Sequence, residues 1–302
     1  DRLPLFNRAT DGVYAPGSTF KLCTAVAALE SGIITPTTTI RDQGVYTYYA
    51  YPQPKCWIYR QYGSTHGSIN VSQAITESCN YFFYETGRLT GIETIDNYAT
   101  QFGLGRSTGI ETGDSKGALA SPEYAKANEL EWTDGQTITA AIGQSYNLFT
   151  PIQLANYVAT LVGDGEHYKA HLLKNVKSYD NSSMIYAYDE GPENTVSISD
   201  STLQAVKKGM YGVANSTLSS QFSRCIVTCG AKTGSAQVGT DIANGTFVCF
   251  APYDDPQIAV AVVIEKGGSG AALAGVAVDI VNAYFSREEI GTAIIGENTL
   301  IS

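Results

Sequence analysis

The sequence predicts an α+β fold in which an antiparallel sheet flanked by helices lies beside an all-helical lobe. Apolar residues recur at helical spacing through the first two thirds of the chain, and extended apolar runs appear in the last third. Two of these runs, 246–251 and 258–265, are separated by Asp254-Asp255-Pro256, a turn that joins two strands in a hairpin. Helices followed by a hairpin-linked sheet are typical of this fold class.

The first expected helix begins at Ser18, directly after the turn signal Pro16-Gly17. Apolar residues follow at intervals of three and four up to Leu29, and Gly32 marks the end. The aromatic-rich stretch 46–62 is expected to be a long connection packed on the domain, with a groove floor for sugar or peptide as the alternative. The other expected helices are 71–78, 80–90, 93–102, 152–162, 201–211 and 271–285, and the expected strands are 225–228, 246–251 and 258–265.

The composition indicates a single domain of the size of a catalytic domain. Its 302 residues are 43% hydrophobic and 16% charged, enough to bury a sizeable core. We expect an α/β lobe from residues 1–33 and about 200–302, and a mainly helical lobe from about 34–199. A net charge of −10 argues against nucleic acid and against a polybasic membrane patch. No apolar run approaches the roughly 20 residues that span a bilayer, and no signal peptide opens the chain, so we expect this piece to be soluble.

Three short motifs follow one another along the chain. They are Ser18-Thr19-Phe20-Lys21, Ser78-Cys79-Asn80 and Lys232-Thr233-Gly234-Ser235. Serine and lysine are common residues, so a chain of this length carries on the order of one S-x-x-K by chance. All three motifs in this order, each in a suitable local setting, make a strong signal.

The first motif has the composition of an activated nucleophile. Ser18 and Lys21 are three residues apart, so both side chains lie on one face at the first turn of the expected helix. A serine nucleophile needs a base for its proton, and a lysine serves only when it is neutral near pH 7. Burial and a second cation both lower the pKa of a lysine, and Lys232 is a candidate for that cation. The N–H groups at the helix N-terminus suit a developing oxyanion.

The chain resembles the transpeptidase domain of class B (monofunctional) penicillin-binding proteins of the elongation or sporulation type. The three motifs are the signature of serine enzymes that react with penicillin. Longer segments resemble the family as well, over residues 10–285 in total. These segments are 14–21 (YAPGSTFK), 78–83 (SCNYFF), 102–112 (FGLGRSTGIET), 142–145 (IGQS), 150–155 (TPIQLA) and 231–237 (AKTGSAQ).

The resemblance implies the fold shared by penicillin-binding proteins and serine β-lactamases, and it implies peptidoglycan D,D-transpeptidation through a serine acyl-enzyme, with D,D-carboxypeptidase side activity and inhibition by β-lactams. Peptidoglycan stem peptides are then the substrates, and no cofactor is expected. The family also implies an N-terminal anchor and a pedestal that this piece lacks. The full-length protein would lie at the outer face of the bacterial cytoplasmic membrane, with membrane proteins of cell-wall synthesis as partners.

The resemblance also assigns roles to single residues. Ser18, Lys21 and Ser78 are the expected catalytic residues, with Ser78 passing a proton to the leaving amine. The expected substrate-binding residues are Asn80, Lys232, Thr233, Gly234 and Ser235.

Within the third motif, the strand can pair its backbone with an extended peptide, and the missing side chain of Gly234 would let that peptide approach closely. The N–H groups of Ser18 and Ser235 form the expected oxyanion hole. The Ser235 hydroxyl, where the family more often has threonine, would hold a terminal carboxylate.

The six cysteines resemble no small disulfide scaffold. Cys23 and Cys79 are expected to be buried small hydrophobes. Cys225 and Cys229 would lie about 13 Å apart along a strand, too far for a disulfide unless the chain bends there. A metal site that combines one cysteine with a distant histidine stays open as an alternative, but no close C-x-x-C or H-E-x-x-H pattern supports it, so no metal is predicted. His167 and His171 are expected at a solvated loop edge.

Three other functions remain as alternatives. A serine β-lactamase shares S-x-x-K and K-T-G, but no motif places a glutamate to activate a deacylating water. A β-lactam sensor domain would be acylated without turnover. A catalytically inactive scaffold is disfavoured because Ser18, Lys21, Ser78, Asn80 and Lys232 are all present. A histidine-dependent triad is disfavoured because the chain has only three histidines, His66, His167 and His171.

Overall fold

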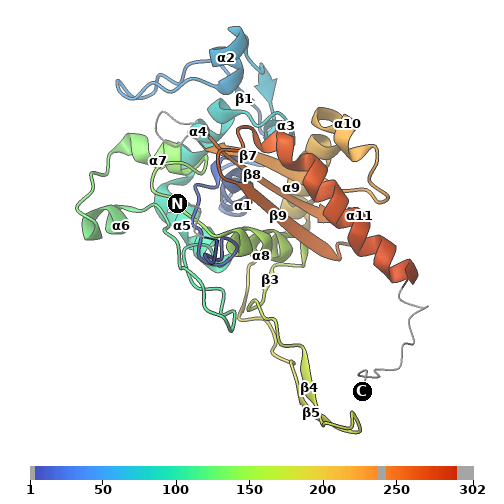
Figure 1. Cartoon of the computed structure of the whole chain (residues 1–302). Coiled ribbons are helices and arrows are strands. Elements are labelled where there is room, and N and C mark those ends of the chain that lie inside the picture. Colours follow the sequence, from blue (N-terminus) through green and yellow to red (C-terminus); the bar gives the residue numbers. More distant parts are fainter. Residues whose placement is uncertain (1–3, 237–242, 291–302) are drawn as a thin grey trace.

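The computed structural model describes residues 4–236 and 243–290, with side chains up to residue 286. It confirms the predicted α+β fold. The central sheet is antiparallel and has the strand order β7-β8-β9 (Figure 1). These strands are β7 (Gly230–Ala236), β8 (Asn244–Ala251) and β9 (Ile258–Ile264). Gln237, the last residue of the expected third segment, lies outside the described residues.

The two faces of the sheet are covered by different helices. Alternate residues of β8 point to opposite sides, as in any strand. Val248 and Phe250 belong to the core shared with α8 (Pro151–Val162) and α9 (Asp200–Gly212), which pack against this side of the sheet. Phe247 and Cys249 instead pack towards α11 (Ala274–Ile290), the long C-terminal helix in Figure 1. The sheet is therefore enclosed between two helical layers.

The expected helices are all found, and their starts have local causes. Asn70 and Gln73 form a capping box at the start of α3, and Thr150 and Gln153 form another at the start of α8. The confirmed helices are η1 (Gly17–Phe20) with α1 (Lys21–Glu30), α3 (Val71–Thr76), α4 (Asn80–Thr90), α5 (Ile92–Gln101), α8, α9, and η3 (Gly270–Leu273) with α11.

Several short helices were not predicted from the sequence. They are α2 (Trp57–Tyr62), α6 (Pro122–Ala127), α7 (Asp134–Ala140), η2 (Val213–Thr217) and α10 (Ser219–Phe222). Each has at most two turns, which is too short for apolar periodicity to show.

Small antiparallel pairs of strands lie outside the central sheet. They are β1 (Ile40–Arg41) with β2 (Ser68–Ile69), β3 (Glu166–His167) with β6 (Asn194–Thr195), and β4 (Asn175–Lys177) with β5 (Met184–Ala187). The β4–β5 hairpin extends far from the body of the molecule (Figure 1), and every residue of β5 is exposed.

The expected strand at 225–228 is wrong. The chain bends here, and the Sγ atoms of Cys225 and Cys229 lie 3.4 Å apart instead of at the ends of an extended segment. The bend is held from outside the segment, because the Asn282 side chain accepts from Ile226 N and donates to Arg224 O. This tertiary contact overrides the strand propensity of the local residues.

The division into two lobes stays a prediction. α8, which lies within the range expected for the helical lobe, packs directly on β8 and β9. In the described ranges, no helix combines the length and apolar character that crossing a membrane requires.

One carboxyl group in the helical core has an unfavourable position. Asp96 in α5 has a buried Oδ1 atom with no hydrogen-bond partner among the described residues. Burial raises the pKa of Asp96 to about 8. An unfolded aspartate has a pKa of about 3.9, so the fold favours the protonated form, and this contribution to stability is lost as the pH rises from about 4 to 8.

We therefore predict that Asp96→Asn makes the domain more stable than the parent at pH 8, and that the difference shrinks at pH 5. Thermal unfolding at both pH values measures it. Asp255→Asn, a change in the exposed turn between β8 and β9, is the control and should show no such pH dependence. An equal shift at both pH values would show that the Asp96 charge is not the cause.

Candidate active site

The three motifs meet at one cavity of about 610 Å³. Ser18 comes from η1 at the start of the first helix, Ser78 and Asn80 from the junction of α3 and α4, and Thr233 and Ser235 from strand β7. Segments separated by more than 200 residues in the chain therefore converge, as the sequence predicts.

Close backbone packing fixes the position of Ser18. Gly17 has a φ of +52°, and a Cβ atom there would meet Ser235 O at 2.9 Å, so glycine is required for the first motif to lie against β7. Gly17 N also donates to Gly143 O at 2.9 Å. Gly143 belongs to segment 142–145, one of those that resemble the family. Through this hydrogen bond the segment supports the loop that carries Ser18, called the nucleophile loop below.

Ser78 occupies a strained position between two helices. Its φ is +53°, in the left-handed region that non-glycine residues rarely adopt. This turn separates α3 from α4 and directs the Ser78 hydroxyl to the two lysines. Lys232 Nζ donates to Ser78 Oγ at 2.9 Å, and Lys21 Nζ lies 3.4 Å from the same oxygen.

Lys21 is further bonded to the second motif. Its Nζ donates to Asn80 Oδ1 at 2.6 Å and to Ser78 O at 2.8 Å. Among the described residues, the Ser18 hydroxyl makes no hydrogen bond to Lys21, although both belong to the same helical turn. Bonds between a nucleophile and its base are often loose before substrate binds. Lys21 is thus placed to move protons between the first and second motifs.

Burial makes both lysines weaker bases than usual. It lowers the pKa of Lys21, which is fully buried, to about 8. It also lowers the pKa of Lys232 well below its usual value, and the charge of Lys21 adds to that decrease. The expectation that Lys232 acts as the cation that depresses Lys21 is therefore not needed, since burial is the main cause for each. A fraction of Lys21 is neutral near pH 7, as a general base requires.

The third motif lies on an edge of the sheet. Within the described part of the chain, β7 pairs with β8 on one side, so its other edge can bind an extended peptide. The expected reason for Gly234 is revised, because a Cβ atom there would meet Pro16 O at 2.5 Å. Gly234 thus makes room for the nucleophile loop, and its role in letting the substrate backbone approach stays a prediction.

Ser235 is oriented for an anion. Its Oγ accepts a hydrogen bond from Gly270 N at 3.1 Å, which leaves the hydroxyl hydrogen available to donate. Ser235 N lies 3.1 Å from the Cβ position of Gly17, which brings this N–H close to the Ser18 loop. Its role in an oxyanion hole and in carboxylate binding remains a prediction.

Sequence reasoning did not identify a cluster behind the second motif. Asp42, Cys56, His66 and Cys79 each offer one ligand atom, and these atoms all lie within 4.8 Å of one another. Cys79 was expected to be a buried small hydrophobe, and it is buried, but its Sγ lies 3.8 Å from Cys56 Sγ. These four residues follow one another at spacings of 14, 10 and 13 residues, which match no known metal-binding motif. The one signal in the sequence was that His66 is the histidine nearest to both Cys56 and Cys79.

The two remaining histidines do not form a site. His167 was expected at a solvated edge, but this is wrong, because it is 1% exposed and its Nδ1 bonds Thr160 Oγ1 at 3.1 Å. His171 stacks on the Tyr188 ring with 3.5 Å between centroids. In the aromatic stretch, Tyr46 is buried against the domain, as expected of a packed connection, while Trp57 lines the catalytic cavity, and a groove floor for sugar or peptide stays a prediction.

The site combines a serine and a lysine on one helix, a second serine between two buried lysines, and an edge strand. This is the arrangement expected from the signature motifs of serine enzymes that react with penicillins. The family model for the penicillin binding protein transpeptidase domain matches residues 1–285. The chain therefore belongs to this family, as the resemblance predicts.

Curated relatives place the chain near one branch of the family. It is 34% identical over 292 residues to peptidoglycan D,D-transpeptidase MrdA of Escherichia coli K12, covering 89% of this chain and 45% of the relative. For the Haemophilus influenzae MrdA the identity is 32% over 312 residues, with 95% and 46% covered. The chain thus spans less than half the length of these relatives.

Solved structures agree with the fold. Pseudomonas aeruginosa PBP2 in complex with WCK 5153 superposes with a TM-score of 0.83 at 31% identity, covering 93% of this chain and 61% of that one. Penicillin-binding protein A of M. tuberculosis, as an imipenem acyl-enzyme, gives a TM-score of 0.79 at 26% identity, with 93% and 62% covered. Both neighbours are penicillin-binding proteins, as the predicted fold requires.

We predict that Lys21→Ala slows acylation of Ser18 by about two to four orders of magnitude, because the proton of the serine loses its acceptor. In the parent, acylation should accelerate as the pH rises through about 8, where Lys21 becomes neutral. Stopped-flow acylation by a fluorescent penicillin from pH 6 to 9 measures both effects. Near-normal acylation by the variant, with circular dichroism showing an intact fold, would remove Lys21 from the mechanism.

A second prediction tests the Ser235 hydroxyl. Ser235→Ala keeps the backbone donor and removes the hydroxyl, so acylation by a penicillin should slow by about one to two orders of magnitude, the loss of one charge-assisted hydrogen bond of roughly 1.5–3 kcal/mol. Ser235→Thr should be much milder because it retains the hydroxyl. Equal rate constants for the two variants would show that Ser235 acts through its backbone alone.

Proposed function

We propose that the domain is a peptidoglycan D,D-transpeptidase that works through a Ser18 acyl-enzyme and is inhibited by β-lactams. The observation that carries this proposal is the Ser78 hydroxyl held between Lys21 and Lys232 at the cavity that Ser18 lines. The names of the MrdA relatives and the acyl-enzyme complexes of structural neighbours support the same chemistry.

The reaction follows from the positions of these groups. Ser18 Oγ attacks the carbonyl carbon of a terminal D-Ala-D-Ala while neutral Lys21 takes the hydroxyl proton. The C–N bond breaks, and Ser78 passes a proton from the lysines to the departing D-alanine amine. The backbone N–H groups of Ser18 and Ser235 stabilise the oxyanion. An amine from a second stem peptide then takes the acyl group.

Partners and location are proposed by analogy with the relatives. One structural neighbour is a Helicobacter pylori PBP2 bound to MreC, at 27% identity and a TM-score of 0.80. We place the full-length protein at the outer face of the bacterial cytoplasmic membrane, where it would act with membrane proteins of cell-wall synthesis.

Intact-mass measurement after penicillin treatment tests the catalytic proposal. A transpeptidase should gain the mass of one penicillin at Ser18 and retain it for many minutes, and Ser18→Ala should gain none. Rapid return to the native mass with hydrolysis of the drug would indicate a β-lactamase instead.

We also propose that Asp42, Cys56, His66 and Cys79 hold a structural zinc ion. Zinc–sulfur bonds of about 2.3 Å at tetrahedral angles place two sulfur atoms about 3.8 Å apart, and zinc-bound sulfur and nitrogen about 3.6 Å apart. The distances between Cys56 Sγ and Cys79 Sγ, and between Cys56 Sγ and His66 Nδ1, are 3.8 and 3.6 Å. His66 Nδ1 and Asp42 Oδ2 lie at a hydrogen-bond distance of 2.7 Å and would separate to about 3.3 Å on binding the ion. Such an ion would fix Cys79, and with it both neighbours in the second motif.

Elemental analysis of the purified domain should find about one zinc per chain. Cys56→Ser should lose the metal, unfold at a lower temperature and acylate more slowly, because Ser78 and Asn80 lose their support. Cys225→Ser, which removes a thiol outside the cluster, should retain the zinc. A metal-free parent with full stability would reject this site.

A further inference from the structure

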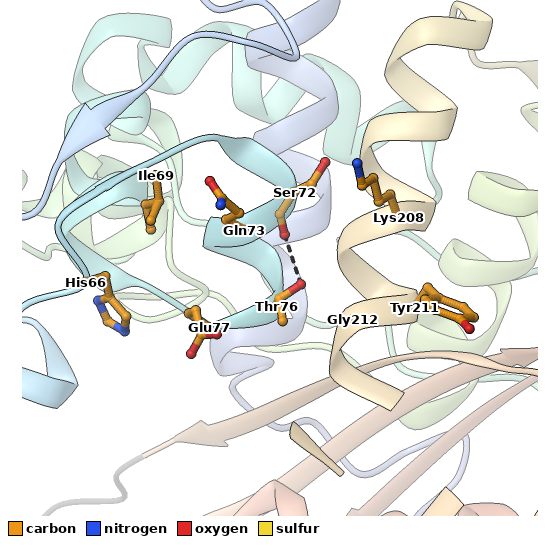
Figure 2. A pocket seen from close by; sticks show the side chains of 9 residues that line it. All are labelled: His66, Ile69, Ser72, Gln73, Thr76, Glu77, Lys208, Tyr211 and Gly212. Carbon is orange, nitrogen blue, oxygen red and sulfur yellow. Dashed lines mark hydrogen bonds between the residues drawn. The ribbon is translucent and has the colours of Figure 1, made fainter. Parts of the chain in front are cut away.

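A second cavity of about 520 Å³ adjoins the catalytic one (Figure 2). It lies between α3 and α9, and its lining residues include Gln73, Lys208 and Tyr211. Thr76 and Glu77 line both cavities, so the two spaces meet at the end of α3, directly before Ser78. A ligand held in the second cavity would therefore lie beside two residues that also border the cavity of Ser18.

The walls of this cavity are fixed by close helix packing. A Cβ atom on Gly209 would meet Ile75 Cβ at 2.6 Å, and one on Gly212 would meet Thr76 Oγ1 at 2.2 Å. Thr76 Oγ1 also donates to Gly209 O at 3.0 Å and lies 3.1 Å from Ser72 O. The two helices are thus held together below the cavity, and its shape is present before any ligand binds.

Charged groups stand on both walls. Glu77 is exposed at the boundary with the catalytic cavity, and its backbone is held in place because Trp57 Nε1 donates to Glu77 O at 3.0 Å. Figure 2 shows Lys208 on α9, opposite Ser72 and at the other end of the lining from Glu77, with Gln73 on the α3 side. The cavity therefore offers an anion next to the reacting centre and a cation farther away.

We propose that this cavity binds the acceptor, a peptide that carries a primary amine and a carboxylate, with the ammonium group at Glu77 and the carboxylate at Lys208. This inference rests on the proposed transpeptidase function. The donor would occupy the β7 edge near Thr233 and Ser235, so the acceptor has to enter from another side. The second cavity provides that entry, and its charges complement such a peptide.

The chemical step is balanced by groups already described. The ammonium group gives one proton to neutral Lys21, directly or through Ser78. The free amine attacks the acyl carbonyl carbon, a C–N bond forms, and the bond from that carbon to Ser18 Oγ breaks. A proton returns from Lys21 to Ser18 Oγ, and the second amine proton leaves to solvent. Glu77 orients the amine and does not take part in bond breaking.

The test compares two fates of one acyl-enzyme, aminolysis and hydrolysis. A thioester analogue of the donor peptide forms the acyl-enzyme, and D-alanine is the amine. We expect Glu77→Gln to lower the ratio of aminolysis to hydrolysis about tenfold, the effect of one charge-assisted contact worth roughly 1.4 kcal/mol. Glu77→Asp should recover part of the ratio. Glu131→Gln, an exposed carboxylate outside both cavities, should leave it unchanged.

Two further comparisons probe the cavity itself. Gln73→Trp should fill it and lower the ratio, whereas Gln204→Trp, on an exposed position of α9 outside the lining, should not. In the parent, a tripeptide acceptor with a free C-terminal carboxylate should be better than the same tripeptide with a C-terminal amide, and Lys208→Gln should remove this preference.

The outcomes separate this inference from the proposed function. An unchanged ratio in Glu77→Gln and Gln73→Trp would overturn the acceptor site. A higher ratio in Glu77→Gln, caused by slower hydrolysis, would also overturn it and would show that Glu77 activates water. If the parent forms no adduct with penicillin, the proposed transpeptidase function itself fails.

Discussion

The removal of Lys21 and Lys232 from water is the constraint on which the rest of the site depends. Each ammonium group loses its hydration, so each lysine gives up its proton far more easily than a surface lysine would. The fold provides this burial because Lys21 lies in the buried first turn of α1 and Lys232 is fully buried on β7. The Ser78 hydroxyl then connects two lysines whose pKa values are both lowered by burial, so it can pass protons between them.

Backbone contacts, more than side-chain contacts, align the three motifs. Gly17, Gly143 and Gly234 allow the nucleophile loop to touch both its neighbours at distances that no Cβ atom would permit. Ser78 accepts an unfavourable backbone conformation because the second motif has to turn between two helices. The proposed zinc ion would hold this turn through Cys79, its middle residue.

The sequence was most informative where local rules decide the outcome. The helix at Ser18 was predictable because its turn, its apolar spacing and its glycine end all agree, and the motifs identified residues that meet at one cavity. The bend at Cys225 was not predictable, because Asn282 holds it from the far end of the chain. Likewise, the four residues of the Cys79 cluster lie just outside the ends of β1, β2, α2 and α4, and the packing of these separate elements sets their distances. The close approach of Gly234 to Pro16 O could not be read from the sequence either, because the two residues lie far apart in the chain.

The β4–β5 hairpin gives this domain a part that can change independently of catalysis. Its strands pair with each other, its side chains are exposed, and it points away from the body (Figure 1). Because the hairpin buries few side chains, it can open without unfolding the core. Its amide hydrogens should therefore exchange before those of the central sheet, and a protease should cut it before the rest of the domain. The tip at Asn181 is therefore a suitable place to attach a dye or graft a foreign peptide, with the nucleophile still intact as a reporter of folding.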